Sequence, residues 1–115
     1  MAFLNLTPHA IVLNDGRHFP ASGFVARVSS DFTLVASIEG IPVYRSVMGE
    51  ITCTGEPNGL PPATEGIFFI VSAMVLEANS RLPNPRTDLV APSTGHPTTI
   101  RNEAGHIVSV EGFVC

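Results

Sequence analysis

Arg86, Asp88 and Arg101 are the residues whose types and spacing best suit the recognition of a small anion. All six cationic side chains belong to arginine, whose planar guanidinium group binds phosphate or carboxylate through paired hydrogen bonds. Arg86 and Asp88 lie two residues apart in a proline-rich segment, residues 81–92, where an extended backbone points both side chains the same way. Two interpretations remain open. Either this pair only holds the loop in place, or Asp88 orients Arg86 as an anion clamp, with Arg101 or Arg81 as a second donor.

Two further groups of polar residues lie next to predicted strands. Asn5, Thr7 and His9 alternate along the first strand, and they either face one site together or form a structural bulge. Ser72 follows a hydrophobic strand without the glycines of a nucleophile elbow, so we interpret it as a helix N-cap. A helix start after a buried strand also suits an anion. We predict no catalytic residues and these ligand-binding residues: Asn5, His9, Arg27, Ser72, Arg86, Asp88 and Arg101.

Metal and cofactor chemistry is not indicated by the sequence. The four histidines are spread along the chain without a His-x-x-x-His pair, and the two cysteines, Cys53 and Cys115, are far apart. We therefore predict no metal site and no cofactor. We interpret both cysteines as free thiols in a reducing compartment.

Net charge and hydropathy limit the classes of partner and the cellular location that we expect. A net charge of −4 argues against binding of bulk DNA or RNA, which needs a basic face. The longest strongly apolar run, Ile67–Val71, is too short to span a membrane, and no signal peptide is evident at the start, so we expect a cytoplasmic protein. Only 14% of the residues are charged. That share indicates either a surface rich in small polar residues or a homo-oligomer that buries part of its surface, and we favour the oligomer.

The spacing of turn signals predicts one domain, residues 1–115, of the α+β class. We expect mostly antiparallel strands, in a meander or a barrel-like sheet, with one short helix around residues 72–80 that must end by Pro83. Turns are predicted at 29–31, 39–40 and 102–105. The predicted strands are Phe3–Leu6, Ala10–Leu13, Phe24–Val28, Phe32–Ile38, Ile41–Met48, Ile67–Val71, Thr98–Arg101 and His106–Val110.

Short motifs recur in order along nearly the whole chain. They are Asn5-Leu6-Thr7-Pro8-His9, Ser22-Gly23, Val25-Ala26-Arg27-Val28, Gly40-Ile41-Pro42-Val43, Gly59-Leu60-Pro61, Ile70-Val71-Ser72, Arg86-Thr87-Asp88-Leu89-Val90-Ala91-Pro92 and Arg101-Asn102-Glu103-Ala104-Gly105-His106-Ile107. This pattern resembles a family of short, uncharacterised proteins from actinobacteria and their phages. The chain departs from it at Asn102, where the resemblance leads us to expect aspartate.

The resemblance brings no assigned activity, but a phage context implies a role by association. Phages encode small oligomeric proteins that sequester cyclic nucleotides or cyclic ADP-ribose signals made by bacterial defence systems. Such a sponge would hold phosphates with arginines and a base with Phe side chains or Tyr44. We therefore expect non-enzymatic binding of a small anionic, nucleotide-like ligand. The alternatives are a small hydrolase that uses His9 or Asp88 as acid or base, and a phage assembly protein without a small ligand.

Overall fold

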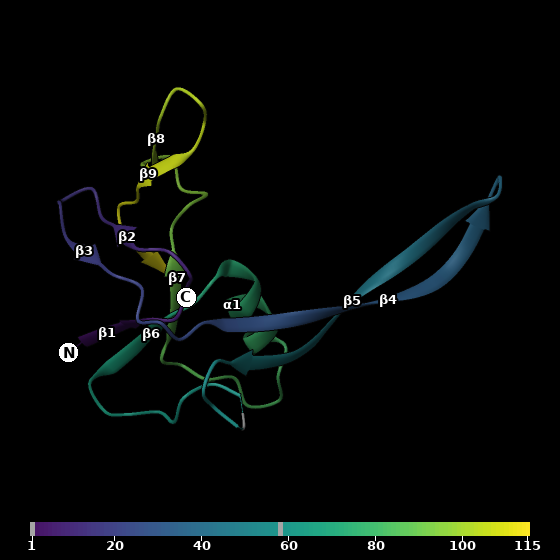
Figure 1. Cartoon of the computed structure of the whole chain (residues 1–115), viewed down its shortest axis with the longest axis horizontal. Helices are drawn as coiled ribbons and strands as arrows, with labels where there is room; N and C mark the ends of the chain where they lie inside the picture. Colours follow the sequence, from purple (N-terminus) through teal and green to yellow (C-terminus); the bar gives the residue numbers. More distant parts are fainter. Residues whose placement is uncertain (1, 58) are drawn as a thin grey trace.

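A four-stranded sheet forms the centre of the molecule in the computed structural model, which describes residues 2–57 and 59–115. The strand order is β1-β6-β7-β10, with β1 parallel to β6, β6 parallel to β7, and β10 antiparallel to β7. In Figure 1 these strands lie side by side in the body of the molecule. Their bounds are Ala2–Asn5 for β1, Ile67–Ile70 for β6, Leu89–Pro92 for β7 and Phe113–Val114 for β10.

The helix α1, Ala73–Ser80, begins directly after β6. The Ser72 hydroxyl accepts a hydrogen bond from the backbone N–H of Val75, so Ser72 is its N-cap. Val75 and Ala78 are buried, while Met74 is exposed, so one side of the helix packs on the sheet. The short central helix and its cap are confirmed.

Two hydrophobic clusters lie on opposite faces of the sheet. Phe69 and Ile70 are successive residues of β6, so their side chains point to opposite sides. Phe69 joins the cluster that includes Val75 of α1, and Ile70 joins a second cluster with Ile11. The second cluster is covered by the hairpin of β2, Ile11–Val12, and β3, His18–Phe19. Consecutive apolar residues in β6 therefore reflect burial of both sheet faces.

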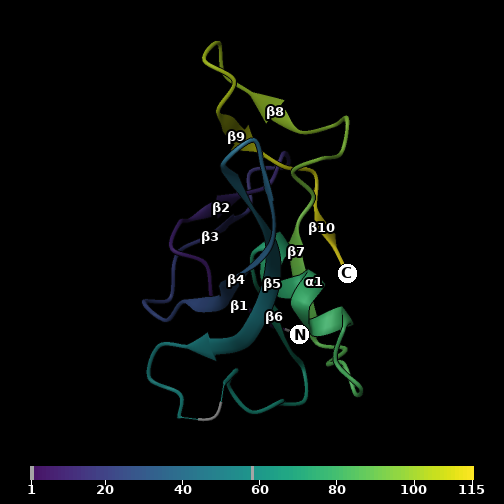
Figure 2. The same cartoon turned by 90° about the vertical axis from the view of Figure 1, so that its right-hand side faces the viewer.

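A second short hairpin lies beyond the end of β7. It joins β8, Ile100–Arg101, to β9, Ile107–Ser109, around residues 102–105, as predicted. The Asn102 side chain accepts hydrogen bonds from the backbone N–H groups of Ala104 and His106, which closes the turn. Figure 2 shows this hairpin at the opposite end of the body from the segment of residues 60–66 that leads into β6.

The longest element is the antiparallel pair β4, Ala26–Ile38, and β5, Ile41–Cys53. The predicted turn at 29–31 is wrong. Ser29 lies in a bulge where the register shifts between Val28 and Ser30, so β4 continues through the three polar residues. The predicted turn at Glu39–Gly40 is confirmed, with φ of 52° and 78°, the two left-handed residues of a type I′ hairpin turn.

The fold class is confirmed as α+β with mostly antiparallel strands and one short helix. Of the six strand pairings within residues 2–57 and 59–115, four are antiparallel. The main sheet is open rather than a closed barrel, and its two parallel pairings were not predicted. None of the helical structure described here is long and apolar enough to cross a membrane.

Cys53 offers a direct test of the packing at the base of β5. Its side chain is buried in the core beside Ala26 and Val75, and burial, followed by the charge of Glu56, raises the pKa of the thiol. Cys115 is exposed. At about pH 8 we expect a thiol reagent to modify Cys115 roughly a hundredfold faster than Cys53, because the thiolate is the reactive form. Following the release of thionitrobenzoate from Ellman's reagent separates the two phases.

The Cys115→Ser variant should lose the fast phase only, and two fast thiols in the folded protein would contradict the packing. The raised pKa also sets the direction of a pH effect. The unfolded thiol ionises first, so the contribution of Cys53 to stability is complete below about pH 8.5 and declines as the pH rises further.

Candidate functional site

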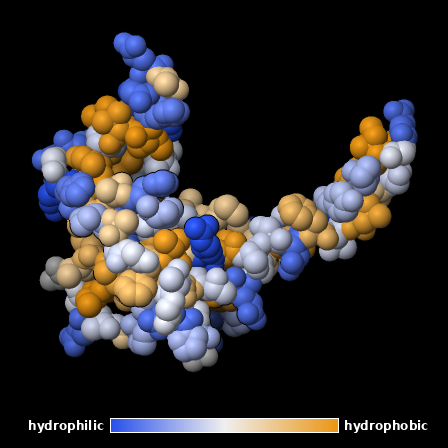
Figure 3. All heavy atoms as spheres, in the orientation of Figure 1, coloured by the Kyte–Doolittle hydropathy of each residue, from blue (hydrophilic) through white to orange (hydrophobic). Residues whose placement is uncertain are grey.

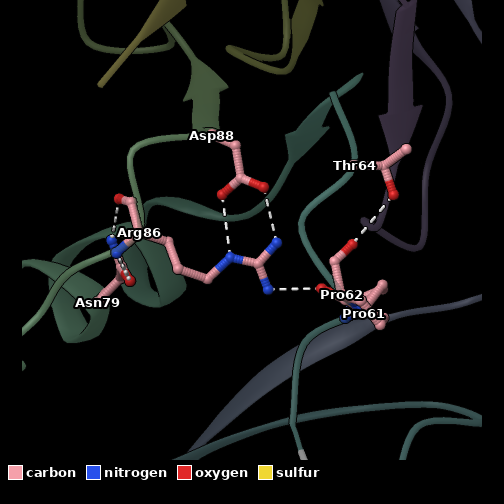
Figure 4. A network of polar contacts seen from close by, with 6 residues as sticks. All are labelled: Pro61, Pro62, Thr64, Asn79, Arg86 and Asp88. Atoms are coloured by element: carbon pink, nitrogen blue, oxygen red, sulfur yellow. Dashed lines mark hydrogen bonds and ion pairs between the residues drawn. The ribbon is translucent and has the colours of Figure 1, made fainter. Parts of the chain in front are cut away.

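Arg86 and Asp88 form a half-buried ion pair at the start of β7. The guanidinium group donates from Nε to Asp88 Oδ1 at 3.0 Å and from Nη2 to Asp88 Oδ2 at 2.7 Å, and the side chains are 24% and 17% exposed. Nη1 donates to the backbone carbonyl of Pro61 (Figure 4). Arg86 also lies over the Phe69 ring, with Cζ 5.4 Å from its centroid. Three of the five guanidinium donors are thus engaged within the chain.

The backbone of Arg86 is held as firmly as its side chain. Asn79, a buried residue of α1, donates to the Arg86 carbonyl and accepts from the Arg86 N–H, both at 3.0 Å (Figure 4). The network therefore ties three parts of the chain together: the helix, the start of β7 and the loop at Pro61. This geometry corresponds to the interpretation in which the pair holds the loop in place.

The other predicted cations do not join Arg86. Arg81 pairs with Glu77 on the exposed side of α1. Arg27 is exposed in β4, and its side chain has no hydrogen-bond partner in the described part of the chain. Arg86 precedes the first residue of β7, whereas Arg101 lies in β8, which Figures 1 and 2 show beyond the other end of β7. An anion clamp that combines Arg86 with Arg101 or Arg81 is therefore not assembled within one chain.

Asn5 organises the turn that follows β1. It is 2% exposed, donates to the carbonyls of His9 and Phe19, and accepts from both the N–H and the hydroxyl of Thr7. The single proton of the Thr7 hydroxyl is shared between Asn5 Oδ1, at 2.6 Å, and the carbonyl of His9, at 2.9 Å. These bonds give Asn5 and Thr7 a structural role, but they hold a bend at residues 7–9 and not a bulge, because β2 pairs with β3 and does not continue β1. The side chain of His9 is exposed and remains available to a nearby site.

A pocket of about 420 Å³ lies at the carboxyl ends of the parallel strands, and we name it the strand-end pocket. Most of its polar lining comes from segments that follow three strands: Thr7 and His9 after β1, Ser72 after β6, and Thr94 after β7, with Ser109 of β9 added. The remaining wall is mostly apolar and includes Ile11, Val12, Ile107, Val108 and Val110.

The start of α1 gives this pocket hydrogen-bond donors. Ser72 and Ala73 line it, and the backbone N–H groups of Ser72, Ala73 and Met74 donate to no other described residue. Arg101 lies near its edge, because Nη2 donates to the carbonyl of the lining residue Thr94 at 3.3 Å. The structure thus brings His9, Ser72 and Arg101 toward one pocket, with Asn5 supporting its wall.

A larger pocket, about 630 Å³, lies between the base of β5, the loop after it and α1. Arg86 lines it together with the carboxylates Glu50 and Glu56. Two acidic side chains and a guanidinium group already engaged by Asp88 make this pocket unfavourable for an anion. The strand-end pocket is the better candidate site for an anionic ligand.

Thr94 is a lining residue that sequence reasoning missed. A correct prediction of parallel β6 and β7 would have indicated it, since ligands bind beyond the carboxyl ends of parallel strands. Within the described residues, no three His, Cys, Asp or Glu side chains gather closely enough to hold a metal ion. No family model, curated protein or solved structure matches the chain.

Proposed function

We propose that the protein binds a small anionic, nucleotide-like ligand in the strand-end pocket and releases it unchanged. The observation that carries this proposal is the convergence of polar groups from three separate segments on one pocket beyond the carboxyl ends of parallel strands. Open sheets with parallel strands hold their ligands at this position. A volume of about 420 Å³ lies within the range of small-molecule sites.

The two kinds of lining suit the two parts of a nucleotide. The free N–H groups at the start of α1 favour a phosphate, and Arg101 at the edge adds a cationic donor. The apolar wall, which includes Val12 and Val108, offers a surface against which a base can pack. A protein that held a cyclic nucleotide or cyclic ADP-ribose in this way would lower its free concentration, which is the sponge role that a phage context suggests by association.

The residues that line the strand-end pocket favour binding of the ligand over its hydrolysis. Among the described lining residues His9 is the only ionisable side chain, and no carboxylate lines the pocket to orient it. A general acid or base normally acts with a partner that holds its tautomer and position.

Thermal unfolding in the presence of cyclic mononucleotides, cyclic dinucleotides and cyclic ADP-ribose tests this function. A ligand at a hundred times its Kd adds about 2.7 kcal/mol to stability, so a bound nucleotide should raise Tm by roughly 10 °C. Chromatography of the ligand after heat denaturation should recover it intact. A chemically altered nucleotide would instead identify a hydrolase, and no shift with any of these ligands would overturn the proposal.

The Ala73→Pro variant tests the location. Ala73 is the first helical residue, where proline is well tolerated, and Ser72 before it is already extended, with φ −68° and ψ 160°. Proline removes the backbone N–H of a residue that lines the pocket, so we expect the Kd to rise about 10- to 100-fold with little change in the Tm of the free protein. Ala73→Ser retains the N–H and is the matched control. Equal affinity of the proline variant and wild type would place the ligand elsewhere.

A further inference from the structure

The outer part of the β4–β5 hairpin stands away from the body, and we name residues 30–47 the arm. Each of these residues is exposed. The Cα radius of gyration is 16.6 Å, whereas a compact chain of 115 residues has about 13 Å. Figure 1 shows the arm extending to the right from the base of the hairpin, where Ala26 and Cys53 belong to the core.

Both faces of the arm carry large apolar side chains. The register places Phe32, Leu34 and Tyr44 on one face, where the rings of Phe32 and Tyr44 meet edge to face. The opposite face presents Ile38, Ile41, Val43 and Val47. Figure 3 shows hydrophobic residues, in orange, between paler and blue polar ones along the side of the arm that faces the viewer. An ordinary solvated hairpin would have one polar face.

One face of the arm supplies the apolar part of an interface. Its four large apolar residues, Ile38, Ile41, Val43 and Val47, are 38–62% exposed, which equals about two fully exposed side chains. A standard protein–protein interface buries about 800 Å² on each partner, so the polar residues of the same face must supply the rest of the contact area. A two-stranded ribbon alone in water is also only marginally stable, so a covering surface would stabilise the arm.

The charges on the arm are complementary to a second copy of the same arm. The arm carries three charged residues: Asp31 and Arg45 lie on the face of Ile41 and Val43, and Glu39 lies at the tip. None of the three forms an ion pair within the part of the chain that the structure describes. If two arms lie antiparallel about a two-fold axis at Val43, Arg45 of each copy points toward the tip of the other. Arg45 and Glu39 are then within side-chain reach at about 3.3 Å of rise per residue.

We propose that the arm is a self-association surface, and that two copies of this chain pack their arms together along the face of Ile38, Ile41 and Val43. Contact between the arms buries apolar residues that the monomer leaves in water, and it pairs Arg45 with Glu39 twice by symmetry. The sparse charge of the whole chain is then a consequence of assembly. This proposal is independent of ligand binding, because the arm contributes no residue to the strand-end pocket.

Sedimentation equilibrium of the purified chain tests self-association. We expect a dimer or larger assembly at about 10 µM, and a Kd at least a hundredfold higher for Ile38→Thr/Ile41→Thr, in which threonine preserves the strand propensity. Ile100→Thr in β8 is the control, since Ile100 is also an exposed strand residue but lies outside the arm. A wild-type chain that stays monomeric at about 100 µM would overturn the proposal and indicate a different partner for the arm.

A charge exchange tests the arrangement of the two arms. Arg45→Glu alone and Glu39→Arg alone should each weaken self-association at least tenfold, because each places like charges opposite one another. Mixing the two single variants should restore it, since both contacts in the mixed pair are attractive. Failure of the mixture to associate better than either variant alone would overturn the pairing of Arg45 with Glu39. Circular dichroism of each variant confirms that the hairpin is retained.

Discussion

The Arg86→Ala variant is expected to lose about 3 kcal/mol of stability, with a fall in Tm of roughly 10–15 °C. The substitution removes both hydrogen bonds to Asp88, the bond to the Pro61 carbonyl and the contact with the Phe69 ring. It also leaves the half-buried carboxylate of Asp88 without its counter-ion. Loss of one partner of a buried pair costs more than the pair contributes, because the remaining charge stays desolvated. Urea unfolding followed by circular dichroism measures the change.

The Arg81→Ala variant is the matched control for this result. Arg81 also pairs with a carboxylate, but it and Glu77 are 66% and 54% exposed, and such pairs contribute less than about 1 kcal/mol. The double variant Arg86→Met/Asp88→Leu should be more stable than Arg86→Met alone, since no unpaired charge remains. Equal losses for Arg86→Ala and Arg81→Ala would contradict a structural role for Arg86. If Arg86→Ala left stability unchanged but weakened nucleotide binding, the anion-clamp interpretation would be supported instead.

Local patterns predicted the elements whose geometry is set by neighbouring residues. Ser72 after an apolar strand indicated the start of the helix, and Glu39–Gly40 between two β-rich segments indicated the tight turn. Each of these features depends on residues close in sequence, through a cap hydrogen bond or left-handed backbone angles. The two-residue spacing of Arg86 and Asp88 likewise placed both side chains in one ion pair.

Local sequence patterns did not predict which strands pair when they are far apart in the sequence. The turn predicted at 29–31 is a bulge, because three polar residues are equally compatible with an exposed strand and with a turn. The parallel pairings of β6 with β1 and β7 join segments that other elements separate, the strands β2 to β5 in the first case and α1 in the second, and nothing local specifies their direction. The strand-end pocket depends on those pairings. Single residues such as His9 and Ser72 were therefore identified from the sequence, but the arrangement that brings them together was not.

The Asn5→Ala variant is the second substitution with a large expected effect, a loss of about 3 kcal/mol. Asn5 makes four hydrogen bonds while 2% exposed, and alanine would leave the carbonyls of His9 and Phe19 and the N–H of Thr7 without these partners. Urea unfolding measures the loss. Asn102→Ala is the control, because Asn102 also accepts two backbone N–H groups but is exposed to water, and it should cost about 1 kcal/mol.

The Asn5→Asp variant tests which side-chain atoms of Asn5 account for its contribution to stability. Asn5 Oδ1 accepts from Thr7, whereas Nδ2 donates to two carbonyl oxygens. A carboxylate would keep the first contacts and place its second oxygen against those carbonyls. Burial and this repulsion should raise the pKa of the introduced carboxyl group above its unfolded value of about 3.9. The variant should therefore approach wild-type stability below about pH 4 and lose stability as the pH rises through the raised pKa. A variant equally stable at neutral pH would show that Asn5 does not hold the turn through these donors.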